Sequence, residues 1–214
     1  MKRLLMSLGM AAIAASAFAS WNVTILNSSG TLYSPATPIT VPTLVQSSPI
    51  PQITFQAAIA TPNPFIVGMG TGFSNGSFLG QYTINDPTNT QPYLSGFNFV
   101  MSGFVYDYGI VNWFKKVVRN SDNAILWQGS GSFLGDAYSG GSDGVFSVVI
   151  PVSLSVPAND VTVYETFQLL GGNLPGSGAA LMLIEQDWTV VPEPASMIAL
   201  ATGLGGLLLR RRKA

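Results

Sequence analysis

The sequence predicts an all-β protein: a single β-sandwich or jelly-roll-like domain flanked by an N-terminal signal helix and a C-terminal apolar helix. Short runs of β-branched and aromatic residues are divided by clusters of Gly, Pro, Asn, Asp and Ser, a spacing typical of sandwiches and barrels. No stretch of the body shows an amphipathic helical period. A length of 214 residues fits one domain plus processing segments, which we place at 1–19 (signal peptide), 20–190 (body) and 191–214 (C-terminal segment).

Composition excludes several kinds of chemistry. The chain has no Cys and no His, so disulfides, thiol nucleophiles, the common zinc sites and His-based triads lack their side chains. Residues 20–190 hold three basic residues against nine acidic ones, a balance that argues against binding a phosphate backbone. We therefore expect no nucleic-acid partner, no metal site of the common zinc type and no cofactor.

The N-terminus has the pattern of a secretory signal. Lys2 and Arg3 precede an apolar stretch, and Ala17-Phe18-Ala19 is the small-x-small pattern that signal peptidase accepts, so the mature chain is expected to begin at Ser20. The apolar stretch of about twelve residues would reach roughly 18 Å as a helix, against about 30 Å of bilayer core. It is too short to be a membrane anchor.

The first half of the body contains four expected strands and one extended connection. The connection, residues 34–51, contains five prolines, which argue against a central strand. The last of the four strands is long enough to bend at Gly96 or Gly103. The strands are Trp21–Leu26, Gln52–Ala60, Ser77–Ile84 and Tyr93–Tyr106.

The second half begins with the best hairpin of the chain. Val111–Arg119 and Ala124–Gln128 flank Asn120-Ser121-Asp122-Asn123, whose short polar side chains favour a turn. Within its first strand, Lys115 and Lys116 should point to opposite faces.

The clearest strand is Val145–Val156, in which apolar side chains alternate with more polar ones. Pro151 has no N–H to donate, so we expect an edge strand or an irregularity there. Two more strands, Val161–Leu170 and Ala179–Val190, should follow, joined by a Gly-rich loop. The predicted buried face of the first strand consists of Phe146, Val148, Ile150, Val152, Leu154 and Val156.

The C-terminal segment has three parts in order. Pro192, Glu193 and Pro194 form a proline-fixed, extended peptide that an enzyme could grip. Residues 195–209 can form an apolar helix of roughly 22 Å, a marginal membrane span. The basic cluster that follows should stay cytoplasmic and stop export, and it consists of Arg210, Arg211, Arg212 and Lys213.

These three parts resemble the PEP-CTERM sorting signal, a tail also named after the C-terminal domain of an ice-binding protein. The resemblance implies an exported protein of a Gram-negative bacterium, cut near the motif by a membrane-embedded exosortase and passed to the cell surface or extracellular matrix. A plain membrane anchor that is never cut is the alternative. The body shows no regular Thr array, so ice binding is not expected.

Acidic residues in the body suggest two possible sites, each with a simpler explanation. Glu185 and Asp187 share one face of an expected strand, where they could form a catalytic pair but more simply form a solvated outer face. Asp136 and Asp143 bracket a Gly-rich loop that could hold Ca²⁺, although their spacing matches no EF-hand loop and a plain turn explains them.

Aromatic residues suggest a sugar-stacking platform. Aromatic residues in strands more often belong to the core, and a glycan-binding protein should instead expose two or more of them on one concave face. We expect a non-enzymatic structural or adhesive protein, with a carbohydrate-binding module or glycan-acting protein of the exopolysaccharide matrix as the alternative. The candidate aromatic set is Trp113, Trp127, Trp188 and the run Tyr106-Asp107-Tyr108.

Overall fold

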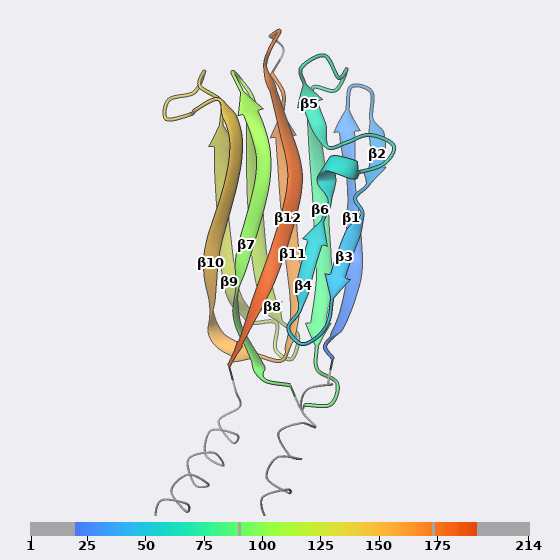
Figure 1. Ribbon diagram of the computed structural model, residues 1–214, viewed down its shortest axis with the longest axis vertical. Coiled ribbons are helices and arrows are strands. Elements are labelled where there is room, and N and C mark those ends of the chain that lie inside the picture. The colour runs from blue at the N-terminus through green and yellow to red at the C-terminus, as the bar shows by residue number, and fades with distance from the viewer. Residues whose placement is uncertain (1–19, 90, 173, 192–214) are drawn as a thin grey trace, which may run out of the picture.

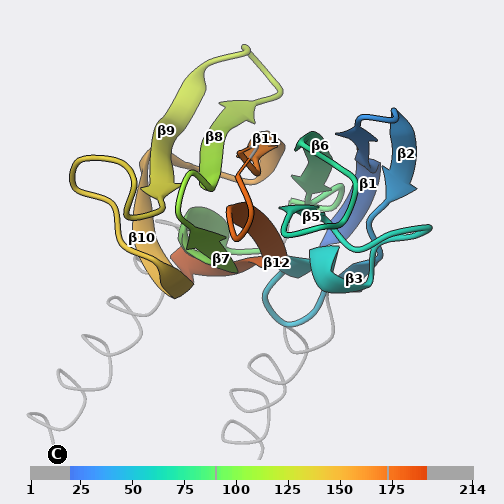
Figure 2. The same ribbon diagram turned by 90° about the horizontal axis from the view of Figure 1, so that it is seen from above.

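The computed structural model describes residues 20–89, 91–172 and 174–191 and shows two antiparallel β-sheets packed face to face, as Figures 1 and 2 show. The predicted all-β sandwich is confirmed. Sheet I has the order β2 (Thr37–Thr40), β1 (Asn22–Tyr33), β6 (Asn75–Asn85), β11 (Asp160–Leu170), β8 (Ile110–Arg119) and β9 (Ile125–Leu134). Sheet II has the order β10 (Gly144–Ala158), β7 (Tyr93–Tyr106), β12 (Gly178–Val191), β4 (Gln52–Phe55) and β3 (Thr43–Gln46), and β5 (Ile66–Gly68) also pairs with β12.

The core lies between the two sheets and is rich in aromatic rings. Alternation along each strand places one apolar set inward, as in β11, where Val161, Val163, Phe167 and Leu169 are buried. Phe97 and Phe99 of sheet II meet rings from sheet I at centroid distances of 5.7 Å (Phe97 to Trp127) and 5.4 Å (Phe99 to Trp113). Edge-to-face contacts of this kind add to the stabilisation that burial gives.

The predicted hairpin is confirmed. The N–H of Arg119 donates to the carbonyl oxygen of Ala124 at 2.9 Å, and Asn123 closes the turn with a φ of 58°. The Arg119 guanidinium and the backbone N–H of Ala124 bind the carboxylate of Asp122 and lower its pKa to about 2. This pair is exposed, so it contributes little to stability.

Strand β10 is an edge strand, as Pro151 predicted. It pairs with β7 from Gly144 to Ser153, and then the register shifts between Ser153 and Ala158. The prediction that Val156 lies on the buried face is wrong: Val156 is 48% exposed because the irregularity takes it out of the alternation.

The proline-rich segment 34–51 differs in part from the prediction. It contains two short strands, β2 and β3, and each lies at the outer edge of its sheet. Proline is tolerated at an edge because no ladder bond is lost there. The expected strand over 52–60 ends at Phe55 and continues into a 3₁₀ turn at Ala57–Ile59, and β5 was not predicted.

The pairing between β7 and β12 is irregular beside both glycines expected to bend the long strand. The register shifts between Leu181 and Leu183, opposite Gly103, and between Thr189 and Val190, next to Gly96. The start of β1 and the end of β12 lie at one end of the sandwich in Figure 1, and the loops β7–β8, β9–β10 and β11–β12 lie at the other. Among the described residues no helix is long and apolar enough to cross a membrane.

Candidate functional site

Three loops meet at the end of the sandwich opposite the C-terminal end of β12: residues 107–109, residues 135–143, and residues 171–172 with 174–177. The N–H of Gly135 donates to the carbonyl oxygen of Gly109 at 2.9 Å. A Cβ on Gly135 would lie 2.1 Å from the carbonyl oxygen of Asp107, so only glycine allows this approach. We call these three loops the distal loops.

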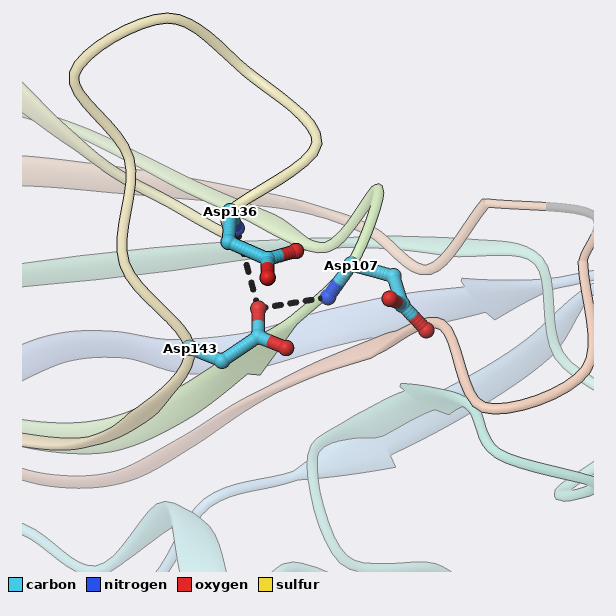
Figure 3. A group of neighbouring side chains, drawn as sticks. All are labelled: Asp107, Asp136 and Asp143. Carbon is cyan, nitrogen blue, oxygen red and sulfur yellow. Dashed lines mark hydrogen bonds between the residues drawn. The ribbon is translucent and has the colours of Figure 1, made fainter.

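A cluster of three carboxylates lies in the distal loops, as Figure 3 shows. Ligand oxygens of Asp107, Asp136 and Asp143 lie within 4.8 Å of one another. Asp143 Oδ1 accepts the backbone N–H of Asp107 at 2.7 Å and that of Asp136 at 2.9 Å. Asp136 and Asp143 are the sequence-predicted pair, and the fold adds Asp107 from β7–β8.

Two physical roles fit this cluster. Three nearby carboxylate oxygens are hard ligands of the type that Ca²⁺ prefers. The two N–H donors to Asp143 also give a metal-free role, because they compensate its charge and tie the β9–β10 loop to the β7–β8 turn. The hydrogen bonds establish the second role.

Replacing Asp143 with Ala is expected to loosen the β9–β10 loop. The change removes two hydrogen bonds to a charged acceptor, an effect of about 1.5–3 kcal/mol for each such bond at most. We expect faster amide exchange at Asp107 and Asp136 and faster proteolysis within 135–143. Asp143→Asn keeps an acceptor oxygen and serves as the control. Equal protection from amide exchange and proteolysis in Asp143→Ala and the parent would refute the proposed tie between the two loops.

The candidate tryptophans belong to the core, as the simpler interpretation held, and form no exposed platform. Trp113 and Trp188 are buried, and Trp127 is half-buried, packed against Phe97 in the core. The physical reason is alternation: Trp113 shares its face of β8 with Val111 and Val117, so it must point inward with them.

The tyrosines of the predicted platform divide between two environments. Tyr106 is half-buried and packs on Phe104, with ring centroids 5.6 Å apart. Tyr108 is 43% exposed in the distal loops, and its ring meets Tyr138 edge-on at 5.9 Å. The exposed aromatic surface near the three aspartates therefore comes from Tyr108 with Tyr138, which sequence reasoning had not paired.

Glu185 and Asp187 lie on the outer face of sheet II, as the simpler prediction held. Asp187 Oδ1 accepts from Gln52 Nε2 at 2.6 Å, and Glu185 Oε2 accepts from the Thr54 hydroxyl at 3.3 Å. Both partners are cross-strand neighbours on β4. The two carboxylates therefore form polar pairs across the sheet surface, and Gln186 and Trp188 between and beside them are buried.

A buried polar cluster in the core was missed by sequence reasoning. Lys115 Nζ donates to Glu165 Oε2 at 2.7 Å, and both side chains are fully buried. Gln186 Nε2 also donates to Glu165 Oε2, at 3.1 Å. The detectable signal was the position of Lys115 and Glu165 in the otherwise apolar inward registers of β8 and β11. We call Lys115, Glu165 and Gln186 the core triad.

Burial dominates the electrostatics of this cluster. It lowers the pKa of Lys115 to about 8, although the charge and hydrogen bond of Glu165 oppose the shift. Burial and the Glu165 charge together raise the pKa of Tyr82 well above its usual value. Lys115 Nζ lies 4.2 Å from the Phe99 ring centroid and 5.1 Å from that of Phe97, which partly compensates its charge.

The processing residues predicted from the sequence lie largely outside the described residues. These are the cleavage-site residues Ala17 and Ala19, the motif Pro192, Glu193 and Pro194, and the cluster Arg210, Arg211, Arg212 and Lys213. Ser20, the predicted first residue of the mature chain, is described and exposed.

Comparison with solved structures gives low similarity throughout. TmCBM61 in complex with β-1,4-galactotriose is 11% identical with a TM-score of 0.30, over 85% of this chain and 94% of that one. The xylan-binding module CBM15 is 14% identical with a TM-score of 0.29, over 80% and 98%. The family 11 carbohydrate-binding module from Clostridium thermocellum is 8% identical with a TM-score of 0.26, over 81% and 91%. No curated protein matches the chain.

The architecture of the body is an all-β two-sheet sandwich. The C-terminus carries the signal for its sorting. Residues 190–213 match the PEP-CTERM protein-sorting motif. The chain carries this motif at its C-terminus, and the motif implies export and exosortase processing. The resemblance seen in the sequence is thereby confirmed for the tail, which follows directly from β12.

Proposed function

We propose that this protein is a non-enzymatic structural or adhesive component of the cell surface or extracellular matrix of a Gram-negative bacterium. The observation that carries the proposal is the sorting motif at 190–213, attached to a sandwich that buries most of its tryptophan surface. A domain that is retained among polysaccharides needs a stable fold and an exposed surface for contact with them, and it needs no catalytic site.

The outer face of sheet I supports this role. Its outward positions are mostly hydroxyl and amide side chains, which can exchange hydrogen bonds with a hydrated polysaccharide without strong charge. A shallow hollow of about 400 Å³ lies over β1, β6 and β11 on this sheet. The outward set includes Ser29, Thr31, Ser77, Gln81, Thr83, Asn112, Gln128, Ser130, Ser132, Thr166 and Gln168.

Deletion of the gene tests the role in the native host. We expect weaker adhesion or a less cohesive matrix, restored by the parent protein and equally by the Glu185→Gln, Asp187→Asn double variant. The purified body should release no sugar from the host exopolysaccharide, because these carboxylates are engaged in hydrogen bonds with Gln52 and Thr54 on the outer face of sheet II. Hydrolysis by the parent that the double variant lacks would overturn the non-enzymatic proposal.

Glycan binding at the distal loops is the second candidate function. Tyr108 presents an exposed ring beside Tyr138 and Asp107, and a ring with nearby carboxylates can stack on a sugar and bind its hydroxyl groups. The distal loops lie at the end of the sandwich opposite the C-terminal end of β12, as Figure 1 shows.

Affinity electrophoresis in host exopolysaccharide tests this candidate. Tyr108→Ala should lose any retardation that the parent shows, with and without added Ca²⁺ as parallel arms. Tyr33→Ala is the matched control, because Tyr33 is 39% exposed but lies on β1, outside the distal loops. Equal retardation of the parent and Tyr108→Ala would reject the distal loops as the glycan site.

A further inference from the structure

The core triad brings an amine, a carboxylate and a primary amide together out of contact with water. Lys115 and Glu165 are direct cross-strand partners on β8 and β11, and Gln186 reaches them from β12 in the opposite sheet. All three residues have zero exposed surface. Glu165 Oε2 accepts hydrogen bonds from both Lys115 Nζ and Gln186 Nε2, so the amine and the amide converge on one oxygen atom.

A glycine on β6 makes room for this arrangement, and a second glycine flanks it on β9. Gly80 pairs with Glu165 on β6, and a Cβ there would lie 2.7 Å from Glu165 Cγ and Oε1. Gly129 pairs with Lys115 on β9, on the other side of the pair. In this cross-strand row of sheet I, glycines lie on both sides of Lys115 and Glu165, so only these two residues extend long side chains. Both side chains are fixed against Gln186 and the Phe99 ring.

We propose that Lys115 and Gln186 form an intramolecular isopeptide bond across the two sheets, with Glu165 as the group that transfers the proton. The new bond joins Lys115 Nζ to Gln186 Cδ, and the bond that breaks is Cδ–Nε2 of Gln186. It links β8 to β12 covalently in a chain that has no cysteine for a disulfide.

The reaction balances without any further reactant. The Lys115 ammonium gives one proton to the Glu165 carboxylate, and the neutral amine attacks Gln186 Cδ. A second amine proton passes to Nε2, directly or through Glu165, and ammonia leaves. One ammonium, one carboxylate and one primary amide thus become one secondary amide, one neutral carboxylic acid and one ammonia molecule.

The surroundings favour each step. The lowered pKa of Lys115 makes the neutral amine accessible near neutral pH, and proton transfer removes two buried charges at once. Gln186 Oε1 has no hydrogen-bond partner among the described residues, so it is free to accept a proton from Glu165 as negative charge develops on it. Fixed positions on strands of the two facing sheets remove the entropy cost of bringing the groups together.

The intact mass of the native protein, measured after denaturation, tests the proposal. We expect it to be one ammonia below the mass calculated for the termini found. Digestion should yield a branched peptide that joins Lys115 to Gln186. A full calculated mass would overturn the proposal, as would a loss of water, which would join Lys115 to Glu165. An ammonia loss that maps elsewhere, for example to Asn75-Gly76, would overturn it too.

Two variants test the part played by Glu165. Glu165→Gln is similar in size but cannot accept the lysine proton, so it should show the full calculated mass and no branched peptide. Glu185→Gln is the matched control, because Glu185 is next to Gln186 but points to the outer face, and it should keep the branch. A branched peptide in Glu165→Gln at parent yield would refute the proton-transfer role.

Discussion

Replacing Pro192, Glu193 and Pro194 with alanine is expected to leave the full-length precursor in the membrane fraction. The apolar segment and the basic cluster that follow are unchanged, so they should still hold the chain there. The change removes the fixed, extended prolyl peptide that an exosortase would grip. The expected effect is large, because processing is lost as a whole.

Mass and location of the body in the native host measure this effect. With an active exosortase the parent should lose roughly its last twenty residues, and without the enzyme it should keep them. The alanine variant should keep them in both hosts. Pro175→Ala, a proline change in the β11–β12 loop, is the control and should be processed like the parent. Normal processing of the alanine variant would leave only a plain C-terminal anchor.

Replacing Glu165 with Ala is expected to destabilise the sandwich by about 3–5 kcal/mol, because Lys115 then stays an unreacted amine buried without its partner, and loss of the proposed cross-link adds to this effect. Neither Gln186 nor the Phe99 ring can neutralise the ammonium. The midpoint of denaturant unfolding measures the change. The exposed pair gives the contrast: Asp122→Ala should leave the midpoint nearly unchanged, because solvent already screens Arg119.

A double variant separates charge from packing. Lys115→Met with Glu165→Leu puts two apolar side chains where the ion pair was, and it should be more stable than Glu165→Ala alone. Both proteins lack Glu165, so neither can form the proposed isopeptide bond, and the comparison isolates the unpaired charge. A double variant that is less stable than Glu165→Ala would show that the lost packing, and not the buried charge, dominates.

Local patterns predicted most of the strands. Alternation and turn residues placed β7, β8, β10, β11 and β12 within about two residues of their observed ends, because a half-buried strand must repeat every second residue. Pro151 correctly marked an edge. The same local logic failed at Val156, where an irregularity in the pairing, which depends on the partner strand, breaks the alternation.

Candidate sites were harder to predict, because they depend on which strands become neighbours. Asp136 and Asp143 are close in sequence and were found, but Asp107 comes from a separate loop. Trp113 and Trp188 were expected more often in the core than on a surface platform, but an aromatic side chain in a strand fits either face by itself. Only the packing of one sheet on the other decided that both rings are buried.

The sequence by itself determined the all-β character of the protein and its sorting tail. Both are local properties: the tail is a motif, an apolar run and a basic cluster in that order, and each strand is an alternation of side chains. Tertiary structure alone decided the core triad. Lys115, Glu165 and Gln186 lie on three strands and in two sheets, and the sequence separation between Lys115 and Glu165 is 50 residues. Their meeting depends on strand order and on the room that Gly80 leaves, which no local pattern encodes.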